Sequence, residues 1–93
     1  MRTLKELYQL LLDNHRSYIN GICSNIDHLW NKDLISDEEY NVLSDDFKRR
    51  KPNIFSKFYW NEYYTGGVYW WANHSLGDEQ RKLFLQHIIK KLK

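Results

Sequence analysis

The sequence predicts a mostly α-helical or all-α fold, a compact bundle of four to five short helices that forms a single domain over residues 1–93. Two observations favour helices. Apolar residues recur at helical spacing in several stretches, and capping sequences mark where helices begin. The length of the chain predicts a single domain, because 93 residues have room for one core and not two.

The first helical stretch starts at Thr3, which has the spacing of a capping box with Glu6. Its apolar face consists of Leu4, Leu7, Tyr8, Leu11 and Leu12, in a phase that can continue through His15, Tyr18 and Ile19. A second apolar face follows and consists of Ile22, Cys23, Ile26, Leu29 and Trp30. Asn20-Gly21 separates the two faces, and Gly costs a helix interior about 1 kcal/mol relative to Ala. One long helix and two shorter helices both fit, and we favour two with a break between Asn14 and Gly21.

The next helix has the clearest start, because Ser36 and Glu39 form a second capping box with extra acids in the first turn. Ile35 and Tyr40 have the spacing of a hydrophobic staple, and the core face continues through Leu43 and Phe47. The basic run 48–51 suits the negative end of a helix, and Pro52 is expected to stop it. Since the link over residues 31–35 is short, the helices on either side should pack as an antiparallel hairpin.

An aromatic segment, residues 53–73, carries nine of the fifteen aromatic residues and only two charges. We expect it to be the central packing and recognition element. A short helix over about 54–64, followed by a turn at Gly66-Gly67, is one reading. A small β-hairpin over 59–72 is the alternative, because β-branched and aromatic residues favour strands.

The last helix is expected from about residue 79 to 92, capped by Asp78 or, as the alternative, by Ser75. Acidic residues at its start and lysines at its end match the helix dipole. Its apolar face consists of Phe84, Leu85, Ile88, Ile89 and Leu92.

Residue spacing argues against catalysis and against a metal site. Cys23, Asp27 and the four histidines make no Cys-x-x-Cys or His-x-x-x-His pair. No nucleophile elbow and no Gly-rich phosphate loop occurs. Glu62 and His74 flank the aromatic turn and could form an acid–base pair, but solvated loop residues explain them more simply. We therefore expect a non-enzymatic protein without cofactor or metal.

The net charge and the cysteine content indicate which classes of partner and which cellular compartment to expect. A net charge of +2 is weak for a nucleic-acid binder. The single Cys23 fits a reducing compartment, and no apolar run is long enough for a membrane span or typical of a signal peptide. We expect a bacterial host cytoplasm and no membrane partner.

Two groups of residues are candidates for binding. Clustered Trp and Tyr residues dominate interface hot spots, although some must fill the core. A basic run beside such rings can hold a phosphate while a ring stacks a base, although a helix end also favours cations. The candidate residues are Trp60, Tyr63, Tyr64, Tyr69, Trp70, Trp71, Arg49, Arg50 and Lys51.

A loose pattern covers most of the chain from Gly21 onward. It consists of Gly21-Ile22-Cys23, Ile26, Leu29, Ile35-Ser36, Glu39, Lys51-Pro52, Phe58, Trp60, Tyr69-Trp70-Trp71, Arg81, Phe84-Leu85 and Ile88. In this pattern the chain resembles small phage-encoded accessory proteins. The resemblance implies a phage origin and an accessory role, and such proteins often bind and disable a host or anti-phage defence component. It transfers no catalytic or binding residue.

The leading hypothesis is therefore a non-enzymatic phage protein that inhibits a bacterial protein target through an aromatic surface. The alternative is a sponge that sequesters a signalling nucleotide, with Arg49, Arg50 or Lys51 on the phosphate. A weak nucleic-acid-binding module is a third hypothesis, which the low net charge disfavours. An exposed aromatic face on so small a domain is also compatible with a homodimer.

Overall fold

The computed structural model describes residues 1–19, 21–58 and 78–92 of the chain, and these residues are mostly helical. The helices are α1 (Leu4–Asp13), α2 (Ile22–Asn31), α3 (Asp37–Phe58) and α5 (Asp78–Lys91). No strand occurs within these ranges, and the predicted all-α or mostly α fold is confirmed. The alternative hairpin over 59–72 falls outside the described residues.

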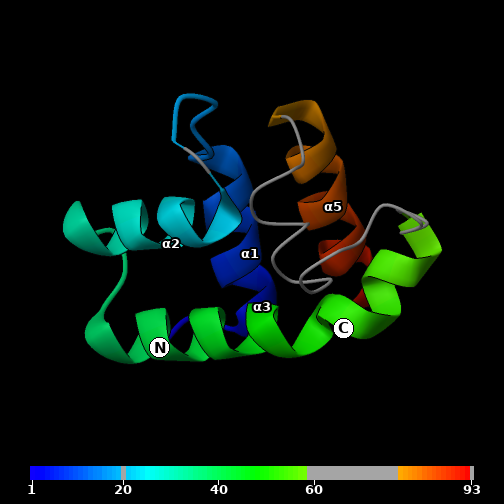
Figure 1. Cartoon of the computed structure of the whole chain (residues 1–93). Coiled ribbons are helices and arrows are strands. Elements are labelled where there is room, and N and C mark those ends of the chain that lie inside the picture. Colours follow the sequence, from blue (N-terminus) through cyan, green and yellow to red (C-terminus); the bar gives the residue numbers. More distant parts are fainter. Residues whose placement is uncertain (20, 59–77, 93) are drawn as a thin grey trace.

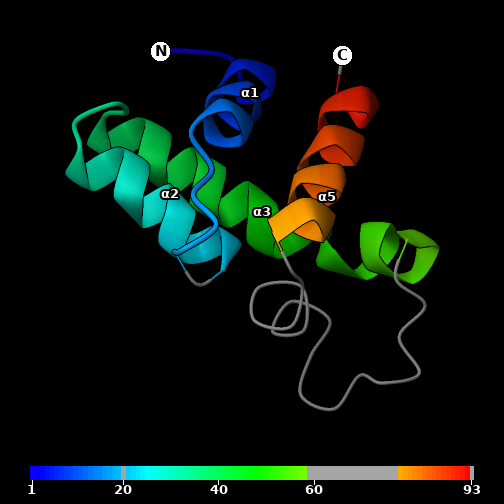
Figure 2. The same ribbon diagram turned by 90° about the horizontal axis from the view of Figure 1, so that it is seen from above.

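Two helix pairs make up the arrangement (Figures 1 and 2). In the first pair, α2 and α3 run antiparallel and pack against each other, as the short link over 31–35 predicted. In the second pair, α1 and α5 lie side by side, antiparallel, and cross α3. Because α1 contacts all three other helices, it is the central element of the described structure. None of the described helices combines the length and apolar character that crossing a bilayer requires.

Both predicted capping boxes are present. The Thr3 hydroxyl accepts from the Glu6 amide at 3.2 Å, while the Glu6 carboxylate accepts from the Thr3 amide at 2.8 Å. Ser36 and Glu39 make the same exchange at the start of α3, at 3.1 and 2.9 Å. These bonds satisfy amides that have no partner inside the helix.

The break between the first two helices falls where the sequence placed it. Helix α1 ends at Asp13 and α2 begins at Ile22, with Gly21 as its N-cap at a φ of 103°. Gly is suited to this position because it has no Cβ to clash at positive φ. The helical phase does not continue beyond α1, and Tyr18 is 78% exposed in the connecting loop.

The predicted stop at Pro52 is wrong, because α3 continues to Phe58. It thereby absorbs the first part of the short helix expected over 54–64. A proline ring removes one backbone N–H and clashes with the carbonyl four residues earlier, which can kink a helix without ending it. Figure 1 shows that α3 changes direction toward its C-terminal end. At α5, the helix starts at Asp78, within one residue of the expected start.

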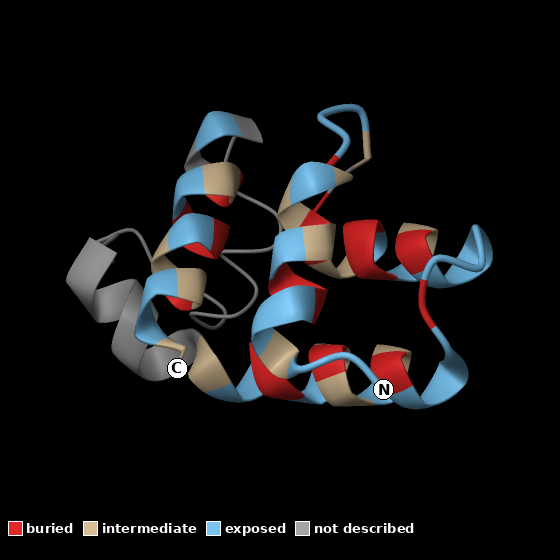
Figure 3. Ribbon diagram, turned by 180° about the vertical axis from the view of Figure 1, so that it is seen from behind, coloured by how far each residue is buried: buried red, intermediate tan, exposed pale blue. Residues whose placement is uncertain are grey.

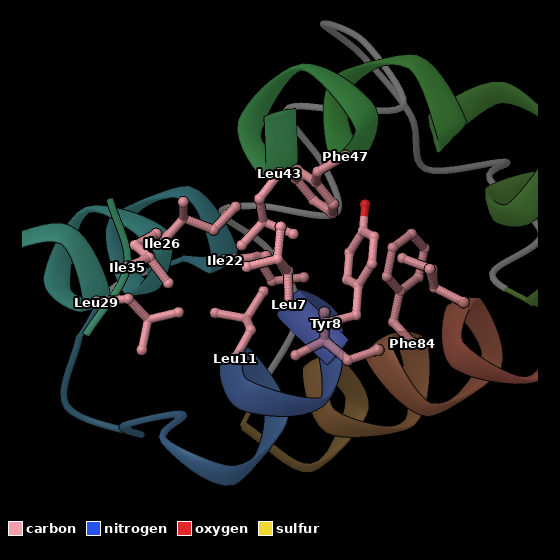
Figure 4. Packing of buried hydrophobic residues seen from close by; sticks show 12 residues of the cluster. Leu7, Tyr8, Leu11, Ile22, Ile26, Leu29, Ile35, Leu43, Phe47 and Phe84 are labelled. Atoms are coloured by element: carbon pink, nitrogen blue, oxygen red, sulfur yellow. The ribbon is translucent and has the colours of Figure 1, made fainter. Parts of the chain in front are cut away.

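The core lies where α1 meets the other three helices (Figures 3 and 4). Phe47 of α3 and Phe84 of α5 pack edge to face, with ring centroids 6.0 Å apart. Each helix contributes residues from its predicted apolar face. The buried apolar residues are Leu7, Tyr8, Leu11, Ile22, Ile26, Leu29, Ile35, Leu43, Phe47, Phe84, Leu85 and Ile88.

A polar contact inside this core joins α1 to α3. The buried Tyr8 hydroxyl donates to Asp46 Oδ2 at 2.7 Å, and Arg50 Nε donates to the same oxygen. Burial, followed by the hydrogen bond to Asp46, raises the pKa of Tyr8 far above its ordinary range. A phenol that stays protonated keeps its donor available to the carboxylate, so this triad fixes the register of α1 on α3.

Candidate functional site

The Schellman turn after α2 brings two aromatic residues together on the surface. The Leu34 amide donates to the Leu29 carbonyl at 2.9 Å and the Asp33 amide to the Trp30 carbonyl at 3.0 Å. Asp33 has a φ of 59°, a left-handed conformation that Asp tolerates better than most residues. This turn reverses the chain within five residues, so that the last turn of α2 faces the first turn of α3.

The two aromatic residues are Trp30 of α2 and Tyr40 of α3, which we call the Trp30–Tyr40 pair. Their ring centroids are 4.9 Å apart and the ring planes are tilted by 30°. Trp30 remains 42% exposed, whereas Tyr40 is half-buried against the edge of the core. Leu34, in the turn, adds another exposed apolar side chain. The hairpin therefore displays apolar area at its tip.

Two aspartates hold the Trp30–Tyr40 pair in place. The Trp30 indole Nε1 donates to Asp37 Oδ1 at 2.7 Å, and the Tyr40 hydroxyl donates to Asp27 Oδ1 at 2.6 Å. The hydrogen bond to Asp27, followed by desolvation, raises the pKa of Tyr40 to about 12. Each ring thus has its polar atom bonded and one face packed, which restricts its rotation without covering Trp30.

The surroundings of this pair are acidic. Residues 22–40 contain five Asp or Glu residues and one Lys, in a chain whose net charge is +2. Glu39 is buried and paired with Arg2, while Asp27, Asp33, Asp37 and Glu38 are exposed. The hairpin is therefore a negatively charged end of a weakly basic protein, and it favours partners that carry positive charge.

The predicted binding residues are only partly placed. Trp60, Tyr63, Tyr64, Tyr69, Trp70 and Trp71 lie outside the described residues, as do Glu62 and His74. Arg49 is exposed on α3, whereas Arg50 is half-buried and paired with Asp46. Lys51 continues the same helix. Because α3 runs on to Phe58, the basic run is not a helix end, and that explanation of it is wrong.

Sequence reasoning assigned Trp30 to the core face of α2 and missed it as a surface residue. Its position in the helical phase is correct, since it packs toward α3. The signal for exposure was its place in the last turn, directly before the short link, where few neighbours remain to cover a large ring. Cys23 is half-buried against the core, in agreement with the reading of this thiol as a small hydrophobe.

Metal ligation finds no support among the residues described. No group of three or more His, Cys, Asp or Glu side chains comes together within residues 1–19, 21–58 and 78–92. No known protein family, no curated protein and no solved structure matches the chain.

Proposed function

We propose that the protein is a non-enzymatic binding protein that inhibits a bacterial protein target, a host factor or an anti-phage defence component. The observation that carries the binding part of the proposal is the Trp30–Tyr40 pair, in which Trp30 is 42% exposed although its indole is hydrogen-bonded and stacked. The inhibitory role is supported by the resemblance to small phage-encoded accessory proteins and by the missing catalytic motifs.

A fixed and exposed tryptophan suits an interface because its ordering cost is met before the partner arrives. Binding otherwise loses roughly 0.5–1.5 kcal/mol for each side chain that becomes immobilised. Trp and Tyr carry a large share of the energy at interface hot spots. Here the stack on Tyr40 and the bond to Asp37 hold the Trp30 ring before any contact forms.

The partner's surface should be basic. Exposed Asp27, Asp33 and Glu38 belong to the same hairpin as the Trp30–Tyr40 pair and would meet lysine or arginine residues at the rim of the interface. An arginine of the partner could also stack on the free face of Trp30, a cation–π contact worth about 0.5–2 kcal/mol. The aromatic segment 53–73 is proposed as a second contact on sequence grounds alone.

The test begins with affinity capture from bacterial lysates, including strains that carry defence systems, followed by binding measurements with the purified partner. Trp30→Ala should weaken the complex by about 2 kcal/mol, roughly 30-fold, while circular dichroism stays unchanged. Tyr18→Ala is the matched control, because it removes another exposed ring, which lies in the loop between α1 and α2. Equal affinities of Trp30→Ala and wild type would reject this surface, and a partner surface without positive charge would reject the electrostatic part.

A further inference from the structure

The loop between α1 and α2 is held in a fixed shape by one buried amide. Asn25 Oδ1 accepts from the Arg16 amide at 2.8 Å, and Asn25 Nδ2 donates to the Gly21 carbonyl at 2.8 Å. Asn25 itself is buried in the first turn of α2. These bonds leave the carbonyl of Ile19, in the same loop, in a defined position next to the start of α5.

Arg81 of α5 reaches this carbonyl. Its Nη1 donates to Ile19 O at 2.9 Å, and the residue is only 4% exposed. The Nε–H of the same guanidinium is fully buried and has no hydrogen-bond partner. The hydrogen bond to the Ile19 carbonyl orients the guanidinium but does not neutralise its charge, because a peptide oxygen carries no net charge.

The other arginines show how unusual this environment is. Arg2 is paired with Glu39 and Arg50 with Asp46, whereas Arg16 and Arg49 are exposed to water. Among the residues whose side chains the structure describes, no carboxylate pairs with Arg81. Burying a charge without a counter-charge costs several kcal/mol, so a folded protein keeps one only where something compensates it.

The backbone at the start of α5 carries positive potential, whereas Asp78 and Glu79 in the same turn carry negative charge. Arg81 is the fourth residue of this helix of 14 residues, and helical side chains tilt toward the N-terminus. Its guanidinium therefore lies beside the first turn, where backbone amides lack partners within the helix and the dipole is positive. Figures 1 and 2 show this end of α5 beside the C-terminal end of α1 and the loop that follows it.

We infer that Arg81 and the first turn of α5 form an anion site that takes a phosphate group. Arginine presents two parallel N–H donors to two oxygens of one phosphate, and the unpartnered Nε–H belongs to such an edge. Helix starts bind phosphate through the same amides and dipole. This site lies on a different helix from the Trp30–Tyr40 pair and does not depend on the proposed protein partner.

The probes are inorganic phosphate and AMP, with sodium chloride at equal ionic strength as the reference, and the readouts are calorimetric titration and ³¹P NMR. Wild-type protein should bind one phosphate group, and Arg81→Gln should lose about tenfold or more in affinity. Arg81→Lys should recover only part of it, because it keeps the charge without the planar fork. Lys5→Gln, which removes an exposed charge on α1, should bind as wild type does. Tighter binding of AMP than of phosphate would extend the site to a nucleotide, whereas equal binding would restrict it to the phosphate group.

Two results would overturn the inference. The first is a wild-type ³¹P titration without shift or broadening up to roughly 10 mM ligand, which needs no variant and therefore decides the question even if Arg81→Gln does not fold. The second is strong coupling of Arg81→Gln with Asp78→Asn or with Glu62→Gln in double-mutant cycles of unfolding, since Asp78 lies three residues before Arg81 on the same helix. Glu62 is the one acidic residue between positions 59 and 77. Coupling with either residue would place the counter-charge within the chain.

Discussion

Glu39 links the N-terminal segment to the start of α3, and removing its charge should make the chain less stable in a pH-dependent way. The Glu39 carboxylate is 5% exposed and accepts from the Ser36 amide at 2.9 Å. It also accepts from the Arg2 amide at 3.0 Å and from Arg2 Nη1 at 3.0 and 3.1 Å. The hydrogen bonds from the backbone amides of Ser36 and Arg2 are the largest causes that lower the pKa of Glu39 to about 2.

The size of the effect follows from that pKa. The pKa of Glu39 falls from its ordinary value of 4.5 to about 2 on folding, and each unit of this difference corresponds to ~1.36 kcal/mol. The upper limit of its contribution to the free energy of unfolding is therefore about 3 kcal/mol. The Arg2 side chain is 46% exposed, so water screens its share of the interaction. We therefore expect about 1–2 kcal/mol of unfolding free energy from the charge of Glu39 at pH 7.

The direction follows from the lowered pKa. Below its folded pKa, Glu39 is protonated in both the folded and the unfolded chain, and its contribution vanishes. The stabilisation is complete above about pH 4.5 and is lost as the pH falls toward 2. Glu39→Gln cannot titrate, yet its amide oxygen can still accept from the Ser36 amide in the capping box. The variant therefore removes the charge and keeps most of the cap.

The assay is urea-induced unfolding of wild type and Glu39→Gln at pH 7, 5, 4, 3 and 2. The free-energy difference between the two should be about 1–2 kcal/mol at pH 7 and should shrink to near zero at pH 2. Glu38→Gln is the matched control, because Glu38 lies in the same helical turn but is exposed. A difference that stays constant from pH 7 to 2 would refute the reasoning, and so would an equal effect of Glu38→Gln.

Three further changes test the internal contacts by chemical denaturation. Asp46→Ala should lower the free energy of unfolding by about 3 kcal/mol, because it leaves the buried Tyr8 hydroxyl unpaired. Tyr8→Phe should lower it by only about 1 kcal/mol, and equal losses for the two variants would contradict the triad. Asn25→Ala should cost about 2 kcal/mol through its bonds to the Arg16 amide and the Gly21 carbonyl, and an unchanged midpoint would show that the loop does not depend on it. Pro52→Ala should stabilise the chain by about 1–3 kcal/mol by restoring a helical amide inside α3, while a loss of stability would contradict a helix continuing through this position.

Local signals in the sequence predicted most of the described fold. Thr3 and Ser36 mark helix starts because their hydroxyls satisfy amides that the helix leaves unpaired, and this chemistry depends only on near neighbours. The short link before Ser36 fixed the antiparallel pairing of α2 and α3 for an equally local reason. Pro52 was misjudged because its effect depends on how many turns follow it, and a long helix can retain one missing bond.

The surface was harder to predict than the core. The helical phase correctly predicted that Trp30 faces α3. The phase gives the direction of a side chain, but it does not say how many neighbouring residues cover it. Trp30 is exposed because α2 ends one residue later, beyond which the chain turns away. Sequence reasoning instead assigned recognition to the aromatic segment 53–73, most of which lies outside the described residues. Its role as a contact stays a prediction.

Arg81 shows why a buried charge could not be read from the chain at all. At the sequence level it is one of several basic residues along a helix that ends in lysines, and solvent exposure is the ordinary outcome for such residues. Its Nη1 donates to the Ile19 carbonyl, which lies 62 positions earlier in the loop after α1. Folding thus fixes one N–H donor of a cation and leaves another, Nε–H, without an acceptor. A contact that served stability alone would be cheaper to build from apolar residues, because they need no counter-charge. The retention of a charge at this point is what the proposed anion site would explain.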